Sequence, residues 1–189
     1  MILEKRTSPL EMAVLGLLHD SPMHGYELRK HLNALLGWGR VFSYGSLYPM
    51  LKTLTKTGYI EAIIDSTGMR KRITYQLTAA GKERFADLIE HVGSQSWEDD
   101  VFNIRFAFFS RTPSKVRLRV LESRKRRLEE LLAHADQGAS KRRADKYTTE
   151  LRRHGLESVE REVKWLSEMI AAEKADLQSK FDQNANKEK

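Results

Sequence analysis

The chain has 189 residues, of which 40% are hydrophobic and 31% are charged, and it contains no cysteine. This composition predicts a folded protein, and it excludes a disulfide framework, a cysteine nucleophile and a thiolate metal site. The net charge of +7 suggests a polyanionic partner, but the charge is divided almost evenly. Residues 1–92 hold 12 Lys+Arg and 9 Asp+Glu, a balance of +3, and residues 93–189 hold 21 and 17, a balance of +4.

Neither the first residues nor any later segment has the pattern of a membrane-directed sequence. Residues 1–9 lack the apolar run of a signal peptide, and no stretch approaches about 18 consecutive apolar residues. We therefore expect no membrane span and a cytoplasmic protein, which the absence of cysteine also fits.

Two helices are predicted at the start of the chain. Ser8 can cap the first, Pro9 suits its first position, and Glu11 completes a capping box. A second helix is predicted from about His24 to Leu36, because leucines recur at helical spacing along it.

A third helix is predicted to begin near Ser43 or Ser46 and to end at Gly58. Leucines at positions 47, 51 and 54 form its apolar side. Pro49 would be costly deep inside a helix, and we expect it to be tolerated because it lies close to the first turn.

The periodicity then changes from helical to alternating. Residues 60–65 and 73–77 predict two strands, and the link between them ends in three consecutive cations, Arg70, Lys71 and Arg72. Thr78 is expected to cap a fourth helix that runs to about Val92. Three helices followed by a two-stranded ribbon are typical of a winged helix-turn-helix, so we predict a DNA-binding domain over residues 1–92.

Residues 93–183 are predicted to be mainly helical. Thr112-Pro113 indicates the start of a helix that runs to about Ala135, a last helix is expected from about Lys141 to Ser179, and residues 184–189 are expected to be a disordered tail. The last helix carries an apolar seam at 3-4-3-4 spacing, which consists of Leu156, Val159, Val163, Leu166 and Ile170. Such a seam can pack within one chain or form a coiled coil with a second copy. We expect a homodimer, because the other faces of these helices are densely charged and this half has no sheet to cover.

Three local features favour DNA as the partner. A helix that begins with Ser and Tyr residues can offer free N–H groups and hydroxyls to phosphates and base edges. The cationic ribbon tip suits the phosphate backbone or the minor groove, and lysines lie on the exposed side of the third helix. The residues predicted to contact DNA are Ser43, Tyr44, Ser46, Tyr48 and Lys52 on the helix and Arg70, Lys71 and Arg72 on the wing.

Three segments in this part of the chain resemble, in order and in spacing, the signature segments of the PadR family of bacterial transcriptional regulators. They are residues 22–28 (PMHGYEL), 45–51 (GSLYPML) and 74–81 (TYQLTAAG). The resemblance implies operator binding by a two-fold dimer, usually as a repressor that a small aromatic or hydrophobic ligand releases. It also implies structural roles for Gly25, as the entry turn of a helix, and for Tyr26, as a packing aromatic. The long helical tail resembles that of the larger subgroup of this family.

Other classes of function find less support in the sequence. No two of the six histidines have the close helical spacing of metal ligands. The acidic residues 98–100 are typical of the start of a helix. We therefore expect no catalytic residue, metal or cofactor. Phe102, Phe106 and Phe109 form either a core stripe or, with Trp97, an effector pocket, in which Trp97 is the expected contact. The alternative to DNA binding is a winged-helix module that binds a protein, but such a module has little need for the wing cations.

Overall fold

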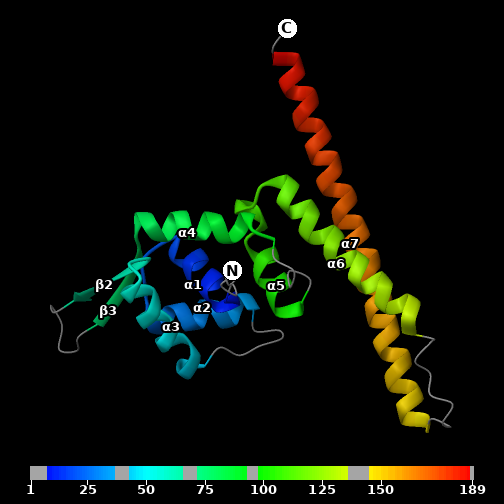
Figure 1. Ribbon diagram of the computed structural model, residues 1–189, viewed down its shortest axis with the longest axis horizontal. Coiled ribbons are helices and arrows are strands. Elements are labelled where there is room, and N and C mark those ends of the chain that lie inside the picture. The colour runs from blue at the N-terminus through cyan, green and yellow to red at the C-terminus, as the bar shows by residue number, and fades with distance from the viewer. Residues whose placement is uncertain (1–7, 37–42, 66–71, 93–97, 136–144, 188–189) are drawn as a thin grey trace, which may run out of the picture. The chain divides into compact units, whose positions relative to one another are not determined.

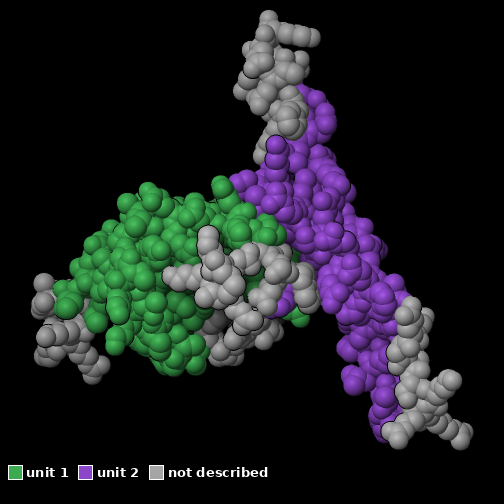
Figure 2. Space-filling model, viewed as in Figure 1, with its two compact units in different colours: residues 1–93, 99–112 green, residues 94–98, 113–189 purple. Residues whose placement is uncertain are grey.

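The computed structural model describes residues 8–36, 43–65, 72–92, 98–135 and 145–187. The chain divides into two compact units, residues 1–93 with 99–112 and residues 94–98 with 113–189, which Figure 2 colours green and purple. The first unit combines helices with a small antiparallel sheet, and the second is formed by two long helices. The mainly helical fold with an N-terminal winged helix-turn-helix, as predicted, is confirmed.

The first helix, α1 (Pro9–Leu18), is the central helix of the first unit. It begins at the predicted residue, and every residue from Met12 to Leu18 is buried. The predicted capping box is wrong, since the side chain of Ser8 makes no capping hydrogen bond. Glu11 instead accepts a hydrogen bond of 2.9 Å from Nε of Arg84 on the fourth helix. A charged partner within reach competes effectively with a backbone N–H for the carboxylate.

A short strand, β1 (Met23–His24), precedes the second helix, α2 (Gly25–Leu36). It pairs with β3, so the sheet has three strands in the order β1-β3-β2 instead of the predicted two. Two residues are too few to show alternation, and the helical periodicity of the following residues concealed the strand. Only its pairing with a segment about fifty residues later reveals it, through His24 opposite Thr74.

The third helix, α3 (Tyr44–Lys56), begins at Tyr44, and Ser43 caps it by accepting a hydrogen bond from the N–H of Ser46. Gly58 ends the helix as predicted, with a φ of 76° that favours glycine. The N–H of Tyr59 then bonds back to the carbonyl of Leu54 at 3.0 Å. Leucines 47, 51 and 54 are buried, so the orientation of α3 is fixed by its apolar side.

The strands β2 (Ile60–Asp65) and β3 (Arg72–Leu77) form an antiparallel ribbon, the wing, and α4 (Ala79–Glu90) follows it (Figure 1). Thr78 caps α4 as predicted, by accepting the N–H of Gly81 at 3.0 Å. A Cβ on Gly81 would lie 2.0 Å from the carbonyl oxygen of Tyr59. Glycine is therefore required where the first turn of α4 packs against the backbone of Tyr59, which is a structural reason for the TAAG segment.

Two further elements complete the first unit beyond residue 92, the boundary predicted from the sequence. They are α5 (Asp99–Ala107) and a turn of 3-10 helix, η1 (Phe109–Arg111). Ile104 and Phe108 are buried in the apolar core that α1 centres. Arg105 is also buried, and it donates hydrogen bonds to the carbonyls of Leu88, Ile89 and His91 at the end of α4. Burial lowers the pKa of its guanidinium below the usual value.

The second unit consists of α6 (Ser114–Ala135) and α7 (Lys146–Lys187), which lie side by side (Figure 1). The helix α7 continues past the predicted start of a disordered tail at residue 184. After Gly155 the sequence contains neither glycine nor proline, so nothing in it breaks the helix. Leu166 is fully buried and Ile170 is 8% exposed within the single chain.

Ion pairs flank the apolar contact between α6 and α7. Arg124 is buried and pairs with Glu162 at 2.8 Å, and Arg117 pairs with Glu173 at 2.7 Å. Glu173 thus occupies a position at which the heptad pattern predicts an apolar residue, and it forms an ion pair with Arg117 of the other helix. No helix in the described part of the chain is long and apolar enough to cross a membrane.

Candidate nucleic-acid interface

The outer side of α3 carries a stripe of polar and aromatic side chains. Tyr44, Tyr48, Lys52 and Lys56 are spaced four residues apart, so they lie along one side of the helix, and all four are exposed. Tyr44 and Tyr48 are 43% and 45% exposed, and their rings stack with centroids 5.7 Å apart. Two large aromatic side chains this exposed present hydroxyls and ring faces to a partner.

The N-terminus of α3 lies at one end of this stripe. Ser43 and Ser46 are both exposed, and Oγ of Ser46 donates to the carbonyl of Ser43 at 3.0 Å. The first turn of a helix has N–H groups without intrahelical partners, and it favours negative charge. The structure therefore brings together all five DNA-contacting residues that the sequence predicts for α3, on the exposed side of one helix.

A hollow of about 470 Å³ opens beside Tyr48, where α2, α3 and the wing meet. Its lining consists of His24, Gly25, Tyr26, Glu27, Tyr48, Ile73 and Tyr75. Burial raises the pKa of Tyr75 above its usual value, and the neighbouring Tyr48 raises it further. The phenol of Tyr75 is therefore protonated near neutral pH and can donate a hydrogen bond.

Hydrogen bonds fix the side of the hollow that the start of α2 forms. Glu27 accepts the backbone N–H of His24 at 2.8 Å, and the ring of His24 lies 3.1 Å from the hydroxyl of Thr74 and 3.2 Å from the carbonyl of Ile73. These contacts tie the start of α2 to the wing strand β3. The sequence contains no signal for the two contacts of the His24 ring, because they join residues about fifty positions apart.

The resemblance implies structural roles for Gly25 and Tyr26, and the environments of these two residues differ. Gly25 begins α2, and a Cβ there would lie 3.3 Å from the hydroxyl of Tyr48, so the position is closely packed. Tyr26 is 60% exposed, and its predicted role as a packing aromatic is wrong. At the first turn of α2 it points away from the face that buries Leu28 and Leu32, and it lines the hollow instead.

The wing presents apolar side chains that the sequence analysis did not single out. Ile64 and Ile73 face each other across the ribbon and are both exposed, as is Ile63 on the other face. Of the predicted wing cations, Arg70 and Lys71 lie outside the described residues, and Arg72 is the first residue of β3. Trp97, the predicted effector contact, also lies outside the described residues.

The three phenylalanines with the spacing of a core stripe lie on α5 and η1. Phe102 and Phe109 are buried, and both rings contact Phe106, with centroid distances of 5.9 Å and 4.9 Å. They form a packed aromatic cluster, which is the core-stripe interpretation of their spacing. No group of three His, Asp or Glu side chains in the described ranges could hold a metal ion.

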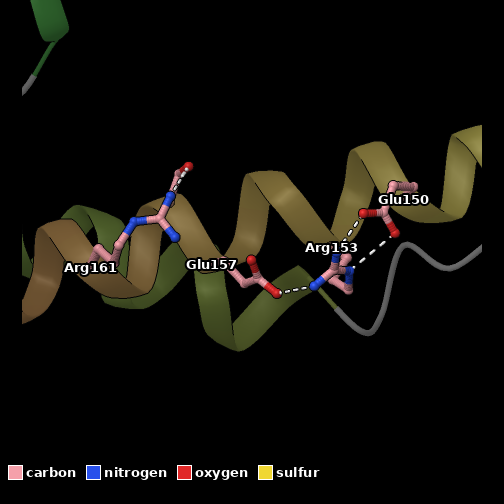
Figure 3. Close-up of polar contacts among 5 residues, drawn as sticks. Glu150, Arg153, Glu157 and Arg161 are labelled. Carbon is pink, nitrogen blue, oxygen red and sulfur yellow. Dashed lines mark hydrogen bonds and ion pairs between the residues drawn. The ribbon is translucent and has the colours of Figure 1, made fainter.

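In the second unit, the N-terminal half of α7 remains accessible. Tyr147 and Leu151 are exposed on α7, and Leu131 is exposed on α6. Figure 3 shows Arg153 between Glu150 and Glu157 on the outside of α7, with ion pairs to both carboxylates. The proximity of Arg153 lowers the pKa of Glu150. The first three residues of the predicted seam, Leu156, Val159 and Val163, are partly exposed. The last two, Leu166 and Ile170, are buried within the single chain.

The exposed helix α3, preceded by α2 and followed by a wing, defines the first unit as a winged helix-turn-helix domain. Residues 14–87 match the transcriptional regulator PadR-like family. Among curated proteins, the negative transcriptional regulator PadR of Bacillus subtilis (strain 168) is 33% identical over 104 residues. That match covers 53% of this chain and 57% of the relative. The match confirms, for residues 14–87, the resemblance seen in the sequence.

Solved structures of the same relative were also found. B. subtilis PadR in complex with operator DNA gives a TM-score of 0.44 at 23% identity, and the complex of B. subtilis PadR with p-coumaric acid gives 0.41, also at 23% identity. Each comparison covers 88% of this chain and 99% of the other.

Proposed function

We propose that this protein is a sequence-specific DNA-binding transcriptional regulator that acts as a homodimer. The observation that carries the proposal is the exposed side of α3, where two stacked tyrosines and lysines follow an exposed helix N-terminus that carries serine hydroxyls. The PadR-like family domain supports a regulatory role. Repression is the expected direction, because the curated relative is a negative regulator.

In this mechanism α3 reads the DNA and the wing positions it. The tyrosine and serine hydroxyls of α3 contact base edges and phosphates in the major groove, while Lys52 neutralises a phosphate. Arg70, Lys71 and Arg72 lie along the backbone or minor groove and supply affinity that is independent of sequence. Binding requires no covalent chemistry, so the work of the protein is to hold these groups in place.

The second unit would hold two such domains at a fixed separation. Leu166 and Ile170 are buried between the helices of one chain, so the surface available to a second copy lies further toward the start of α7. It includes Tyr147 and Leu151 as well as the partly exposed Leu156, Val159 and Val163. Two linked half-sites raise affinity through effective concentration by about 10²-fold or more.

We also propose a small aromatic or hydrophobic effector that releases the DNA, with Trp97 as a contact. The proposal rests on the position of this residue in the sequence, a few residues after the predicted boundary at residue 92. A suitable first probe is p-coumaric acid, the ligand in the B. subtilis PadR structure. Quenching of fluorescence in the wild-type chain, but not in Trp97→Phe, would support the assignment, and equal quenching in both would refute it.

The decisive experiment selects bound duplexes from a random-sequence library with the purified chain and then titrates salt. Replacing Arg70, Lys71 and Arg72 by Ala should weaken binding to selected and random duplexes alike, and it should reduce the log–log salt slope by about 0.9 per residue and protomer. The matched control replaces three exposed cations of the second unit, Arg126, Lys146 and Lys164, and should leave the slope unchanged. An unchanged slope in the wing variant would show that the wing does not touch DNA.

A second candidate function is a winged-helix module that binds a protein. The observation in its favour is the exposure of Ile63, Ile64 and Ile73 on the wing, since β-branched apolar side chains on a ribbon commonly pack against a partner. The same selection separates the two functions. Failure to enrich any duplex, together with weak retention on random DNA at low salt, would favour the protein-binding module.

A further inference from the structure

Arg29 of α2 lies directly against the proposed recognition tyrosines, although nothing in its sequence context marked it. Its guanidinium carbon is 4.1 Å from the centroid of the Tyr44 ring, and the ring of Tyr44 stacks on that of Tyr48 at an interplanar angle of 22°. The three side chains come from two different helices, so the contact exists only in the folded domain. A guanidinium at this distance from an aromatic face is attracted by the electron density of the ring.

Among the described residues, no carboxylate is paired with the charge of Arg29. Nε is buried and has no hydrogen-bond acceptor, and within the described ranges no acidic side chain forms an ion pair with this residue. Other arginines of the first unit differ in this respect, since Arg84 pairs with Glu11 and Arg111 with Asp20. The ring of Tyr44 is therefore the main polarisable group that the guanidinium contacts.

Without such a contact, the two tyrosines would be poorly ordered in the free protein. Each is nearly half exposed, and stacking of residues four apart on a helix contributes only about 0.2–0.5 kcal/mol. Ordering exposed side chains on binding costs conformational entropy, whereas side chains that are already in place do not incur that cost. An anchor on a neighbouring helix is one way to keep them in place.

We propose that Arg29 is a positioning residue for DNA recognition, which presets the Tyr44–Tyr48 pair through its cation–π contact before DNA arrives. The inference rests on the proposed function, because it assigns these tyrosines to the DNA interface. It adds a residue of α2 to the determinants of specificity, which the sequence had placed on α3. Arg29 acts through Tyr44, so its effect must depend on the aromatic ring at that position.

The first arm of the test needs no DNA. Arg29→Met removes the charge but keeps an apolar stem, and Lys30→Met removes a charge from the next, exposed residue of the same helix. Aromatic NMR spectra of the full chain should show the Tyr44 and Tyr48 ring signals shifted and averaged in Arg29→Met and unchanged in Lys30→Met. Unchanged tyrosine signals in Arg29→Met would overturn the proposal, whether or not the protein binds DNA.

The second arm measures binding to a duplex enriched by the wild-type chain and to a random-sequence duplex. Arg29→Met should weaken binding to the enriched duplex by about five- to tenfold more than binding to the random one, the size expected when a partly exposed cation–π contact is lost. Arg29→Lys should retain part of the discrimination, and Lys30→Met should retain all of it. Equal losses on both duplexes would show that Arg29 is only a phosphate contact, and would refute positioning.

A double-mutant cycle then ties the effect to the ring. Tyr44→Phe keeps the aromatic face, so Arg29→Met should still reduce discrimination in that background. Tyr44→Leu removes the face, so Arg29→Met should then have no further effect on discrimination. Additive losses in the leucine background would overturn the proposal. If the wild-type chain enriches no duplex at all, it is the proposed function that fails, and the NMR arm still decides the positioning of the tyrosines.

Discussion

The two units of this protein bury their apolar side chains in different ways. In the first unit, α1 is enclosed by the other helices and the sheet, and side chains as far apart in sequence as Leu15 and Phe108 are buried in one core. In the second unit two helices share a narrow line of contact, in which ion pairs such as Arg124–Glu162 stand beside Leu121 and Leu166. A pair of helices cannot enclose its own apolar surface, and Tyr147 and Leu151 remain exposed. The first unit thus encloses a core of its own, whereas the second unit is a pair of helices in contact along one side of each.

The largest expected effect concerns the residue at which the first unit ends. A fragment of residues 1–112 should fold, whereas residues 1–92 should not, because the shorter fragment loses Ile104, Phe108 and Arg105. Each buried apolar side chain contributes about 1.5–3 kcal/mol, and the total stability of a domain is only about 5–15 kcal/mol. Circular dichroism melts and NMR peak dispersion of the two fragments give the answer. If the shorter fragment is as stable as the longer, α5 is not part of the core.

The second effect separates a buried leucine of the α7 seam from an exposed leucine earlier in the same helix. Leu166→Ala should lower the free energy of unfolding of the second unit by about 2–5 kcal/mol, because it leaves a cavity between α6 and α7. Leu151→Ala should change it by no more than about 0.5 kcal/mol at low concentration, where the chain is monomeric. Urea titrations followed through Trp165 fluorescence, with Trp38 and Trp97 replaced by Phe, measure this unit separately.

In a dimerisation assay the order should be reversed, so that Leu151→Ala has a larger effect than Leu166→Ala. Sedimentation of Leu151→Ala should show a larger dissociation constant than that of the wild-type chain if this part of α7 meets a second copy. An unchanged dissociation constant would place the dimer contact elsewhere.

A smaller effect is expected from Arg105, which joins α5 to the end of α4. Arg105→Ala should destabilise the first unit by about 2–3 kcal/mol, because three carbonyl groups lose a charged donor. The control, Arg111→Ala, removes a half-exposed ion pair to Asp20 and should cost about 0–1 kcal/mol. Urea denaturation of the 1–112 fragment compares the two. Equal losses would mean that the buried guanidinium contributes no more than a surface charge.

The smallest effect is a pH dependence at the start of α7. Asp145 accepts hydrogen bonds from the N–H groups of Tyr147 and Thr148 and from the hydroxyl of Thr148, and these contacts lower its pKa. A carboxyl whose pKa is depressed by folding stabilises the fold above its ordinary pKa of about 3.9, and this stabilisation is lost as the pH falls through the folded value. Cα chemical shifts of residues 146–150 should therefore report fraying in acid. Asp145→Asn should remove the pH dependence and keep the cap, and a wild-type helix start that is insensitive to acid would contradict the assignment.

The sequence alone determined the elements whose signals lie within a few residues of one another. Pro9, Ser43, Gly58 and Thr78 mark the ends of helices through contacts with their own neighbours, so each was predictable from local chemistry. The stripe of candidate DNA contacts on α3 was predictable for the same reason, because a helical period of 3.6 residues fixes which residues share a side.

Only the tertiary structure decided the features whose partners are distant in the chain. Glu11 pairs with Arg84 instead of closing a capping box, and β1 exists because β3 offers it an edge. Arg29 is seen to contact Tyr44 only when α2 and α3 are packed together. In α7 the heptad pattern marked Leu166 and Leu156 alike, yet Leu166 is fully buried and Leu156 is partly exposed. Periodicity specifies which face of a helix is apolar, but what covers that face depends on packing between segments that the sequence does not place.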